Sequence, residues 1–352
     1  MFKNQEGFTN SFFGSYAYQA IIDRHEDHLL VRMHNLIDWS FVESEVADRY
    51  ATLGQHAYHP VIMFKLLVLQ NLYNLSERTV SEQADQNIIY RFFLGIGLND
   101  TIPHWTELGK FRERIGADAF ERLFYRVLDE AQRLGIEISD KRNADATDVK
   151  ANVDLARCGA DKQDGNDHTW ISRNTSDPDA GFGKKSSTPG GKHWYGYKSH
   201  TNNDVETGLI TAVETTKASV TDGSQLATLV DKERDARGED AIRKQGGDKG
   251  YVGNTKDLTD RGILDYTIPR NNMYADREGK RHNTHYLHVK HHRYKVEQKY
   301  AEGKRWHHLG IARYRGRWKV HLQGLLTYLA MNLKRIVHLL FPLATAYTRH
   351  FS

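Results

Sequence analysis

The chain has a single cysteine and no long apolar run, and each absence excludes a class of protein. Cys158 alone cannot form an internal disulfide and has no partner for a cysteine-based zinc site, so disulfide-stapled and zinc-finger folds are excluded. No apolar segment approaches the roughly 20 residues that span a bilayer. Residues 1–18 lack the apolar core and cleavage site of a signal peptide. We therefore expect a cytoplasmic protein without membrane segments.

What the chain does have is length and a concentrated positive charge. Its 352 residues are enough for two ordinary domains, and its net charge is only +4. Residues 281–319, however, hold eleven Lys or Arg and two Glu, together with seven His. Such clustering is typical of a protein that binds a polyanion such as DNA, and a solvated basic face is the alternative.

The N-terminal part of the sequence has the periodicity of helices. Over residues 28–134, apolar residues recur at spacings of three and four. Residues 60–73 begin with a proline and are apolar on nearly every side, as in a buried central helix. Ser and Thr in capping positions predict helices over 76–87 and 106–115. Two short helices joined by a turn either enter a DNA groove or pack in a bundle. We expect an all-α domain over residues 1–140.

After Lys141 the sequence changes to short strand-like runs separated by Gly, Asn and Asp. The expected segments are a strand ending around 145–152, a long polar loop over 161–192, paired antiparallel strands over 194–200 and 208–213 with a turn near 202–204, a helix over 222–234, a strand over 264–268, and a helix over 321–341 that packs on the sheet. This order predicts an α/β domain over residues 141–345, with an RNase H-like mixed sheet flanked by helices.

Three acidic residues have contexts that favour metal binding. Cutting or joining a phosphodiester calls for divalent cations, which Asp and Glu side chains hold. Asp145 ends an apolar-leaning segment, Asp248 follows two glycines, and Glu297 is one of only two acids in the basic stretch. These three are the candidate ligands.

The surroundings of Glu297 have a helical spacing. On one continuous helix, Lys290, Arg293, Glu297 and Lys304 would share a face. That face is either a surface ladder of ion pairs or a DNA-binding surface on which Glu297 holds metal and the cations contact phosphates. Gly303 is expected to weaken the helix just before Lys304.

The chain resembles the DDE transposases of bacterial insertion sequences, in the group with the signature Arg, three residues, Glu, six residues, Lys. Arg293, Glu297 and Lys304 fit that signature. Further similar motifs are Asp145-Ala-Thr-x-x-x-Ala151, Tyr195-Gly-Tyr-Lys198 and Asp248-Lys-Gly-Tyr251, and, in the helical region, Gly54 to Pro60, Leu75-Ser-Glu-Arg78, Tyr90-Arg-Phe-Phe-Leu94 and Phe111-Arg-Glu-Arg114. The resemblance runs from about residue 28 to 340.

The resemblance implies a reaction and its participants. Asp145, Asp248 and Glu297 would bind two Mg²⁺ or Mn²⁺ ions, and Arg293, Lys304 and Lys290 would contact DNA phosphates. Water would cut double-stranded DNA at the terminal inverted repeats of the element, and the freed 3′-hydroxyl would attack target DNA. Holding both ends together implies a homodimer in the synaptic complex. The protein would be associated with the nucleoid.

Three positions depart from the pattern of the family. Lys290 stands where a Tyr is usual, His104 where an acid is common, and the polar 244–247 where an apolar strand is usual. Asp148 and Asp154 are rivals of Asp145 for the first acid.

Other functions remain as alternatives. A related nuclease without strand transfer would use the same three acids, and an inactive DNA-binding relic would keep only the basic stretch. Zinc binding by His282, His285, His288 and His291 is disfavoured, because a three-residue repeat drifts around a helix and no Cys or carboxylate completes the site. Trp170, Trp194 and Trp306 either stack on an unpaired base or pack in the fold.

Overall fold

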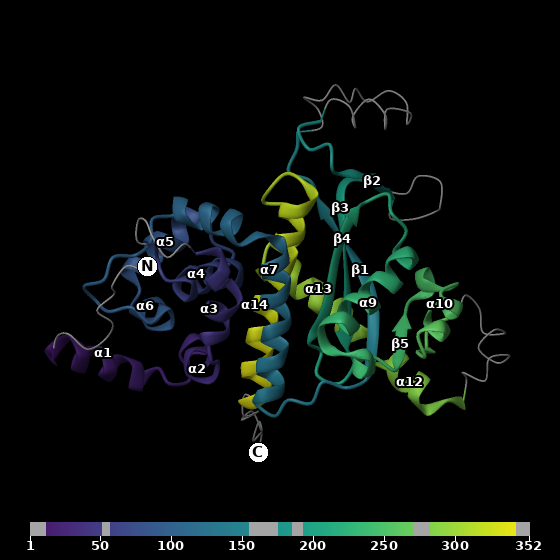
Figure 1. Cartoon of the computed structure of the whole chain (residues 1–352), viewed down its shortest axis with the longest axis horizontal. Helices are drawn as coiled ribbons and strands as arrows, with labels where there is room; N and C mark the ends of the chain where they lie inside the picture. Colours follow the sequence, from purple (N-terminus) through teal and green to yellow (C-terminus); the bar gives the residue numbers. More distant parts are fainter. Residues whose placement is uncertain (1–11, 51–56, 155–174, 185–192, 270–281, 343–352) are drawn as a thin grey trace, which may run out of the picture.

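The computed structural model describes residues 12–50, 57–154, 175–184, 193–269 and 282–342; Cys158 and Trp170 lie outside these ranges. In these ranges the N-terminal part is helical, and a sheet covered by helices follows (Figure 1). The N-terminal elements are α1 (Phe12–Arg24), α2 (Leu29–Leu36), α3 (Ser40–Val46), the 3-10 helix η2 (Ala47–Arg49), α4 (Pro60–Leu72), α5 (Glu77–Gln86), α6 (Ile88–Leu94) and α7 (Thr106–Arg133).

Two of these helices begin where the sequence predicts. Pro60 occupies the first turn of α4, and every residue of that helix except Val61 is buried. Ser76 caps α5 by accepting a hydrogen bond from the Thr79 backbone N–H.

The end predicted for the third helix at Ile115 is confirmed. Gly116 has a non-helical backbone, with φ 79° and ψ 165°, so α7 consists of two helices that meet at a kink there, and the second continues to Arg133. The first residue of α7 differs in role from the prediction. Trp105 holds the capping position and makes no side-chain capping bond, so Thr106 does not cap the helix.

The sheet is mixed. Its strands are β1 (Lys141–Lys150), β2 (Gly181–Lys184), β3 (His193–Asp204), β4 (Ile210–Lys217), β5 (Lys244–Gly247) and β6 (Leu264–Asp265). They lie in the order β2-β3-β1-β5-β6, and β4 also pairs with β3. The β1-β3, β3-β4 and β2-β3 pairs are antiparallel, whereas β5 is parallel to β1 and to β6. This is the predicted RNase H-like sheet.

Several strand boundaries differ from the predictions. Strand β1 ends at Lys150, within the predicted 145–152, but Asp145 lies in the middle of the strand. Asn202, Asn203 and Asp204 are the last residues of β3 and directly precede the turn, in agreement with the prediction, whereas β3 and β4 are both longer than predicted. Part of the segment predicted as a loop over 161–192 forms β2, and most of the remainder lies outside the described residues.

The remaining elements cover the two faces of the sheet (Figure 1). They are the 3-10 helices η3 (Asp222–Gln225), η4 (Glu239–Ala241) and η5 (Lys249–Tyr251), and the helices α9 (Leu226–Arg237), α10 (Thr255–Asp260), α12 (Thr284–His291), α13 (Tyr294–Trp306) and α14 (Arg317–Leu340). The helix predicted over 222–234 is therefore η3 followed by α9. Buried Arg142 of β1 points to the α9 face, where its side chain binds Glu233 at 2.7 Å.

Helix α14 joins the sheet to the N-terminal helices. One apolar core contains residues of α4 and α7, residues of β4, and most of α14. Asn332 of α14 bonds both backbone groups of Ile210 in β4, accepting from its N–H (2.9 Å) and donating to its carbonyl (2.7 Å). Helix α14 packs on the sheet, as predicted, and also on α4 and α7. Nowhere in the described ranges does a helix have the length and apolar character needed to cross a membrane.

Candidate active site

The first candidate acid lies on β1, and the second directly follows β5, the neighbouring parallel strand. Ala144 of β1 pairs with Gly247 of β5, so Asp145 and Asp248 each follow a paired residue at the same level of the sheet. Asn143 of β1 donates a hydrogen bond to the Val289 carbonyl of α12 (2.9 Å). Alternate residues of a strand share a face, so the side chain of Asp145 lies on the face covered by α12 and α13.

Asp145 is poorly solvated for a carboxylate. Burial raises its pKa to about 6, and the charges of Asp248 and Asp222 add to the rise, while the Ala146 N–H and Arg293 oppose it. The side chain is 17% exposed. A carboxylate in this setting gains more from a bound cation than a solvated one, because water stabilises its charge less.

Glu297 reaches the same region through Arg293. One guanidinium nitrogen of Arg293 lies 2.5 Å from Glu297 Oε1, and another lies 3.7 Å from Asp145 Oδ2. The guanidinium therefore links the first and third candidate acids.

The continuous helix predicted around Glu297 is wrong. The chain forms α12 up to His291 and then α13 from Tyr294, and at the junction the Arg293 N–H bonds to the Lys290 carbonyl only three residues back (3.3 Å). Lys290 therefore belongs to a different helix from Glu297. Its ammonium lies 5.9 Å from the centre of the Tyr286 ring.

Lys304 contacts another acid. Its Nζ lies 2.6 Å from Asp148 Oδ1, so Asp148, the rival for the first acid, is the ion-pair partner of Lys304. Gly303 does not weaken the helix before Lys304, since α13 continues to Trp306. A Cβ at Gly303 would lie 2.9 Å from Leu309 Cδ2, so the glycine makes room for the buried Leu309.

Sequence reasoning missed two residues that support the site. The Tyr300 hydroxyl donates to the Asp145 backbone carbonyl (2.6 Å) and contacts Thr201 Oγ1 (2.8 Å), which fixes α13 against β1. Tyr300 follows Glu297 by one helical turn, so this contact also positions Glu297. No signal in the sequence separates this tyrosine from an ordinary core aromatic.

The second missed residue is Asp222, which the sequence marked only as a helix start. Its carboxylate accepts from Lys198 Nζ at 2.8 Å and is close enough to raise the pKa of Asp145. A Cβ at Gly223 would lie 2.8 Å from the Gly250 carbonyl, so η3 and the loop after Asp248 are in close contact. The sequence feature that could have pointed to Asp222 is its partner Lys198, which belongs to the Tyr-Gly-Tyr-Lys motif.

The unusual polar sequence before Asp248 has a packing reason. A Cβ at Gly246 would lie 2.4 Å from Val289 Cγ1, and one at Gly247 would lie 3.1 Å from the Tyr251 side chain. The two glycines allow α12 and Tyr251 to approach β5 from opposite faces. An apolar strand residue with a side chain would not fit at Gly246.

The donor chemistry of the site fits a hard divalent cation. Asp145, Asp248 and Glu297 supply only carboxylate oxygens, and Asp145 has lost much of its hydration. Across the ranges that the structure describes, however, no three His, Cys, Asp or Glu side chains lie close enough together to hold one metal ion. The histidines of α12 form no such group either. One of them, His288, has its Nε2 3.0 Å from Glu206 Oε1.

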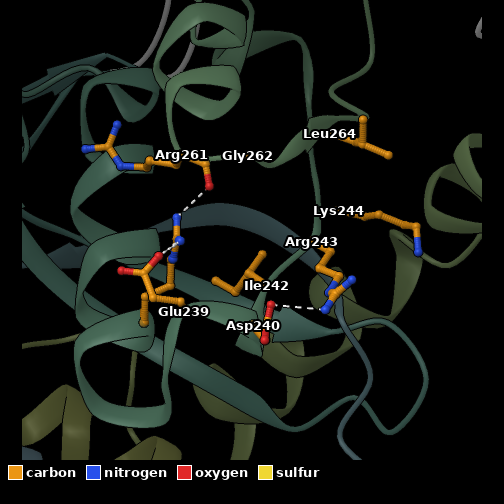
Figure 2. Close-up of a pocket in the computed structure, with 9 residues that line it drawn as sticks. Glu239, Asp240, Ile242, Arg243, Lys244, Arg261, Gly262 and Leu264 are labelled. Carbon is orange, nitrogen blue, oxygen red and sulfur yellow. Dashed lines mark hydrogen bonds and ion pairs between the residues drawn. The ribbon is translucent and has the colours of Figure 1, made fainter.

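A cavity of about 530 Å³ lies at the other end of β5 (Figure 2). Lys244, the first residue of β5, lines it, whereas Asp248 follows the last. The cations at this cavity have acidic partners, such as Asp240 for Arg243 (3.0 Å). It is separate from the candidate active site.

The tryptophans differ in their surroundings. A Cβ at Gly183 of β2 would lie 2.6 Å from the Trp194 ring, so Trp194 packs in the sheet. Trp306, at the end of α13, is 55% exposed, and the Arg305 guanidinium lies 4.8 Å from its ring centre.

Comparison with known families gives two matches in the same chain. Residues 18–114 match a family described as Transposase domain (DUF772), and residues 144–333 match the Transposase DDE domain. The second match covers more than half of the chain and contains Asp145, Asp248 and Glu297. No solved structure is a significant match.

Proposed function

The chain belongs to the Transposase DDE domain family, and from that premise we propose that it cuts double-stranded DNA at the ends of an insertion sequence and joins them to target DNA. The observation that carries this proposal is the placement of Asp145 on β1 and of Asp248 directly after the adjacent parallel strand β5, with Glu297 linked to Asp145 by Arg293. Carboxylates from separate elements are the ligands that the reaction requires.

Asp145, Asp248 and Glu297 would hold two Mg²⁺ or Mn²⁺ ions. When bound, these ions supply a Lewis acid and lower the pKa of a coordinated water. In the cutting step, water attacks a phosphodiester and the 3′-oxygen leaves as a hydroxyl. In the joining step, that 3′-hydroxyl attacks a target phosphodiester and releases another 3′-hydroxyl, so the number of phosphodiester bonds is conserved.

The cations near these acids would hold the DNA. Arg293 occupies the capping position at the start of α13, Lys304 lies on that helix and Lys290 lies near the end of α12, where they would bind phosphates on either side of the cleaved bond. The N-terminal helices, over residues 1–140, would bind the terminal inverted repeats. Since two ends must be joined together, the active form would be a homodimer on the nucleoid.

A cleavage and joining assay tests the proposal. Purified protein is incubated with Mg²⁺ or Mn²⁺, a labelled duplex that carries the ends of the element, and a target plasmid. The wild type is compared with Glu297→Gln, and with Asp257→Asn on exposed α10 as a matched control. We expect metal-dependent nicks and joined products for the wild type and the control, and a loss of at least 100-fold for Glu297→Gln, in line with removal of one transition-state contact.

The outcomes separate the alternatives. Nicks without joined products would identify a nuclease without strand transfer. End binding without any strand breakage in either metal would reject the enzymatic function and identify a DNA-binding relic.

A further inference from the structure

Arg293 is placed between two acids that are both proposed to hold metal. Its guanidinium contacts Glu297 at 2.5 Å and Asp145 at 3.7 Å. A guanidinium presents several N–H donors in a fixed fork, which suits the bridging of two carboxylates. In the free protein Arg293 is therefore the counter-ion of this acidic pair.

This contact competes with a bound metal ion. Asp145 Oδ2 and Glu297 Oε1 are the oxygens that face Arg293, and a divalent cation at this pair would need the same oxygens. A guanidinium within contact distance would also repel that cation. Arg293 thus lies between two of the candidate ligands, and the described residues include no group of three possible ligands close enough together to hold a metal ion.

The Arg293 side chain can move away from Asp145 and Glu297 without breaking a capping bond of α13. Arg293 stands at the capping position of α13 but makes no side-chain capping bond there. Its side chain is 28% exposed, and Glu297 is 57% exposed, so their ion pair is worth little to stability. The helix is interrupted between α12 and α13, so Arg293 lies at a junction between two helices rather than inside one.

We propose that Arg293 blocks the Asp145–Glu297 pair in the free protein and that DNA removes the block, so that DNA and the divalent cation bind cooperatively. When a DNA phosphate binds the Arg293 guanidinium, the facing oxygens of Asp145 and Glu297 become available to the divalent cation. This inference rests on the proposed function of the site. Arg293 is a positioning residue here, because it acts through the two acids.

The first test measures binding of Mn²⁺ to the free protein, using the electron paramagnetic resonance signal of unbound Mn²⁺. We expect Arg293→Gln to bind Mn²⁺ about tenfold more tightly than the wild type, a factor that corresponds to about 1.4 kcal/mol. Arg293→Lys keeps the charge but loses the fork, so its affinity should lie between the two. Arg305→Gln is the matched control, because it removes an exposed cation of α13 whose guanidinium lies over the Trp306 ring rather than between the two acids.

The second test measures the coupling itself. By linkage, the factor by which DNA raises the affinity for Mn²⁺ equals the factor by which Mn²⁺ raises the affinity for DNA. We expect this factor to fall several-fold in Arg293→Gln and to be unchanged in Arg305→Gln. The readout is the affinity for a labelled end duplex with and without Mn²⁺, with the scissile phosphate replaced by a methylphosphonate that resists cleavage.

Three results would decide against parts of this account. Equal or weaker binding of Mn²⁺ by both Arg293 variants would overturn the inference, as would an equal gain in Arg305→Gln. If Glu297→Gln binds Mn²⁺ as well as the wild type does, in the presence of DNA, the proposed site itself fails. Circular dichroism shows whether either Arg293 variant is unfolded. If one is, the measurement is made with the other Arg293 variant.

Discussion

At the residue scale, Lys65 is the least expected group in the N-terminal helices. It is 2% exposed in α4, its ammonium lies 4.6 Å from the Trp39 ring centre, and its Nζ lies 3.2 Å from His34 Nδ1. Burial lowers the pKa of Lys65 to about 7 and that of His34 to about 4. Lys65 thus changes charge near neutral pH within an apolar core.

This pKa fixes the sign of a pH effect on stability. The unfolded chain holds the lysine proton up to about pH 10.4, whereas the folded chain releases it near pH 7. Between these values the unfolded state binds more protons, so Lys65 makes the protein more stable as the pH rises. We expect Lys65→Met to increase the free energy of unfolding at pH 7, by on the order of 3 kcal/mol, and to add progressively less towards pH 9.5.

Urea denaturation at pH 7, 8.5 and 9.5 measures this difference. Glu82→Gln, an exposed change on the neighbouring α5, serves as a control that should show no such trend. A Met variant that is less stable than the wild type at pH 7 would mean that the rings of Trp39 and Phe93 stabilise the ammonium by more than burial costs it.

The sequence identified site residues only where chemistry and local motif coincide. Asp145, Asp248 and Glu297 were singled out as candidates because each stands in a short recognisable context, and the structure brings the first two to the same level of the sheet. Tyr300 and Asp222 were missed because their roles depend on residues far along the chain. Tyr300 contacts the Asp145 carbonyl, 155 residues away.

At the element scale, the packing of α12 on β5 determines how the acids are arranged. Val289 of α12 lies against Gly246, and the Asn143 side chain bonds the Val289 carbonyl. We expect Gly246→Ala to destabilise the fold by about 1–3 kcal/mol, because a Cβ would overlap both Val289 and Asn143. Chemical denaturation measures this cost.

A double mutant separates overlap from a backbone effect. Val289→Ala removes the methyl groups nearest to Gly246, so the combined variant should be more stable than the sum of the two single changes predicts. Strict additivity would show that the cost of Gly246→Ala does not come from contact with α12.

Helices whose first residues carry a start signal were predicted from the sequence, whereas the pairing partners within the sheet were not. Pro60 and Ser76 mark the starts of α4 and α5 through their own chemistry. Strand β1 has few apolar residues, and its length follows from pairing with β3. The polar residues of β3 form a buried ladder, in which Asn202 accepts a hydrogen bond from Gln245 (3.0 Å), a partner that no local pattern reveals.

At the scale of the whole molecule, one apolar core contains residues from both sides of the predicted domain boundary at residue 140. Helix α14 packs on α4, α7 and β4, and the buried residues of all four form one cluster. Arg313 adds polar contacts across the same boundary, to the Leu75 carbonyl (3.0 Å) and to Asn74 Oδ1 (2.6 Å). The DNA-binding role of residues 1–140 stays a prediction, but their packing depends on the rest of the chain.

We therefore expect the whole protein to unfold in one cooperative transition. Residues 1–140 alone should bind the dye ANS and unfold without a sharp midpoint, because the surface that α14 covers would be exposed. Attaching residues 317–340 to that fragment through a Gly/Ser linker should restore a cooperative transition. Calorimetry and near-ultraviolet circular dichroism measure both fragments, and a sharp transition in the isolated residues 1–140 would contradict the prediction.

The shared helix also sets the order of events during translation. Helix α7 ends at Arg133, but α14 begins only at Arg317. At about 5–20 residues per second, the ribosome takes roughly 10–40 s to make the intervening segment. Throughout that interval the nascent N-terminal helices lack the helix that completes their core. A nascent chain that stops before α14 is thus a substrate for chaperones and proteases rather than a partly working protein.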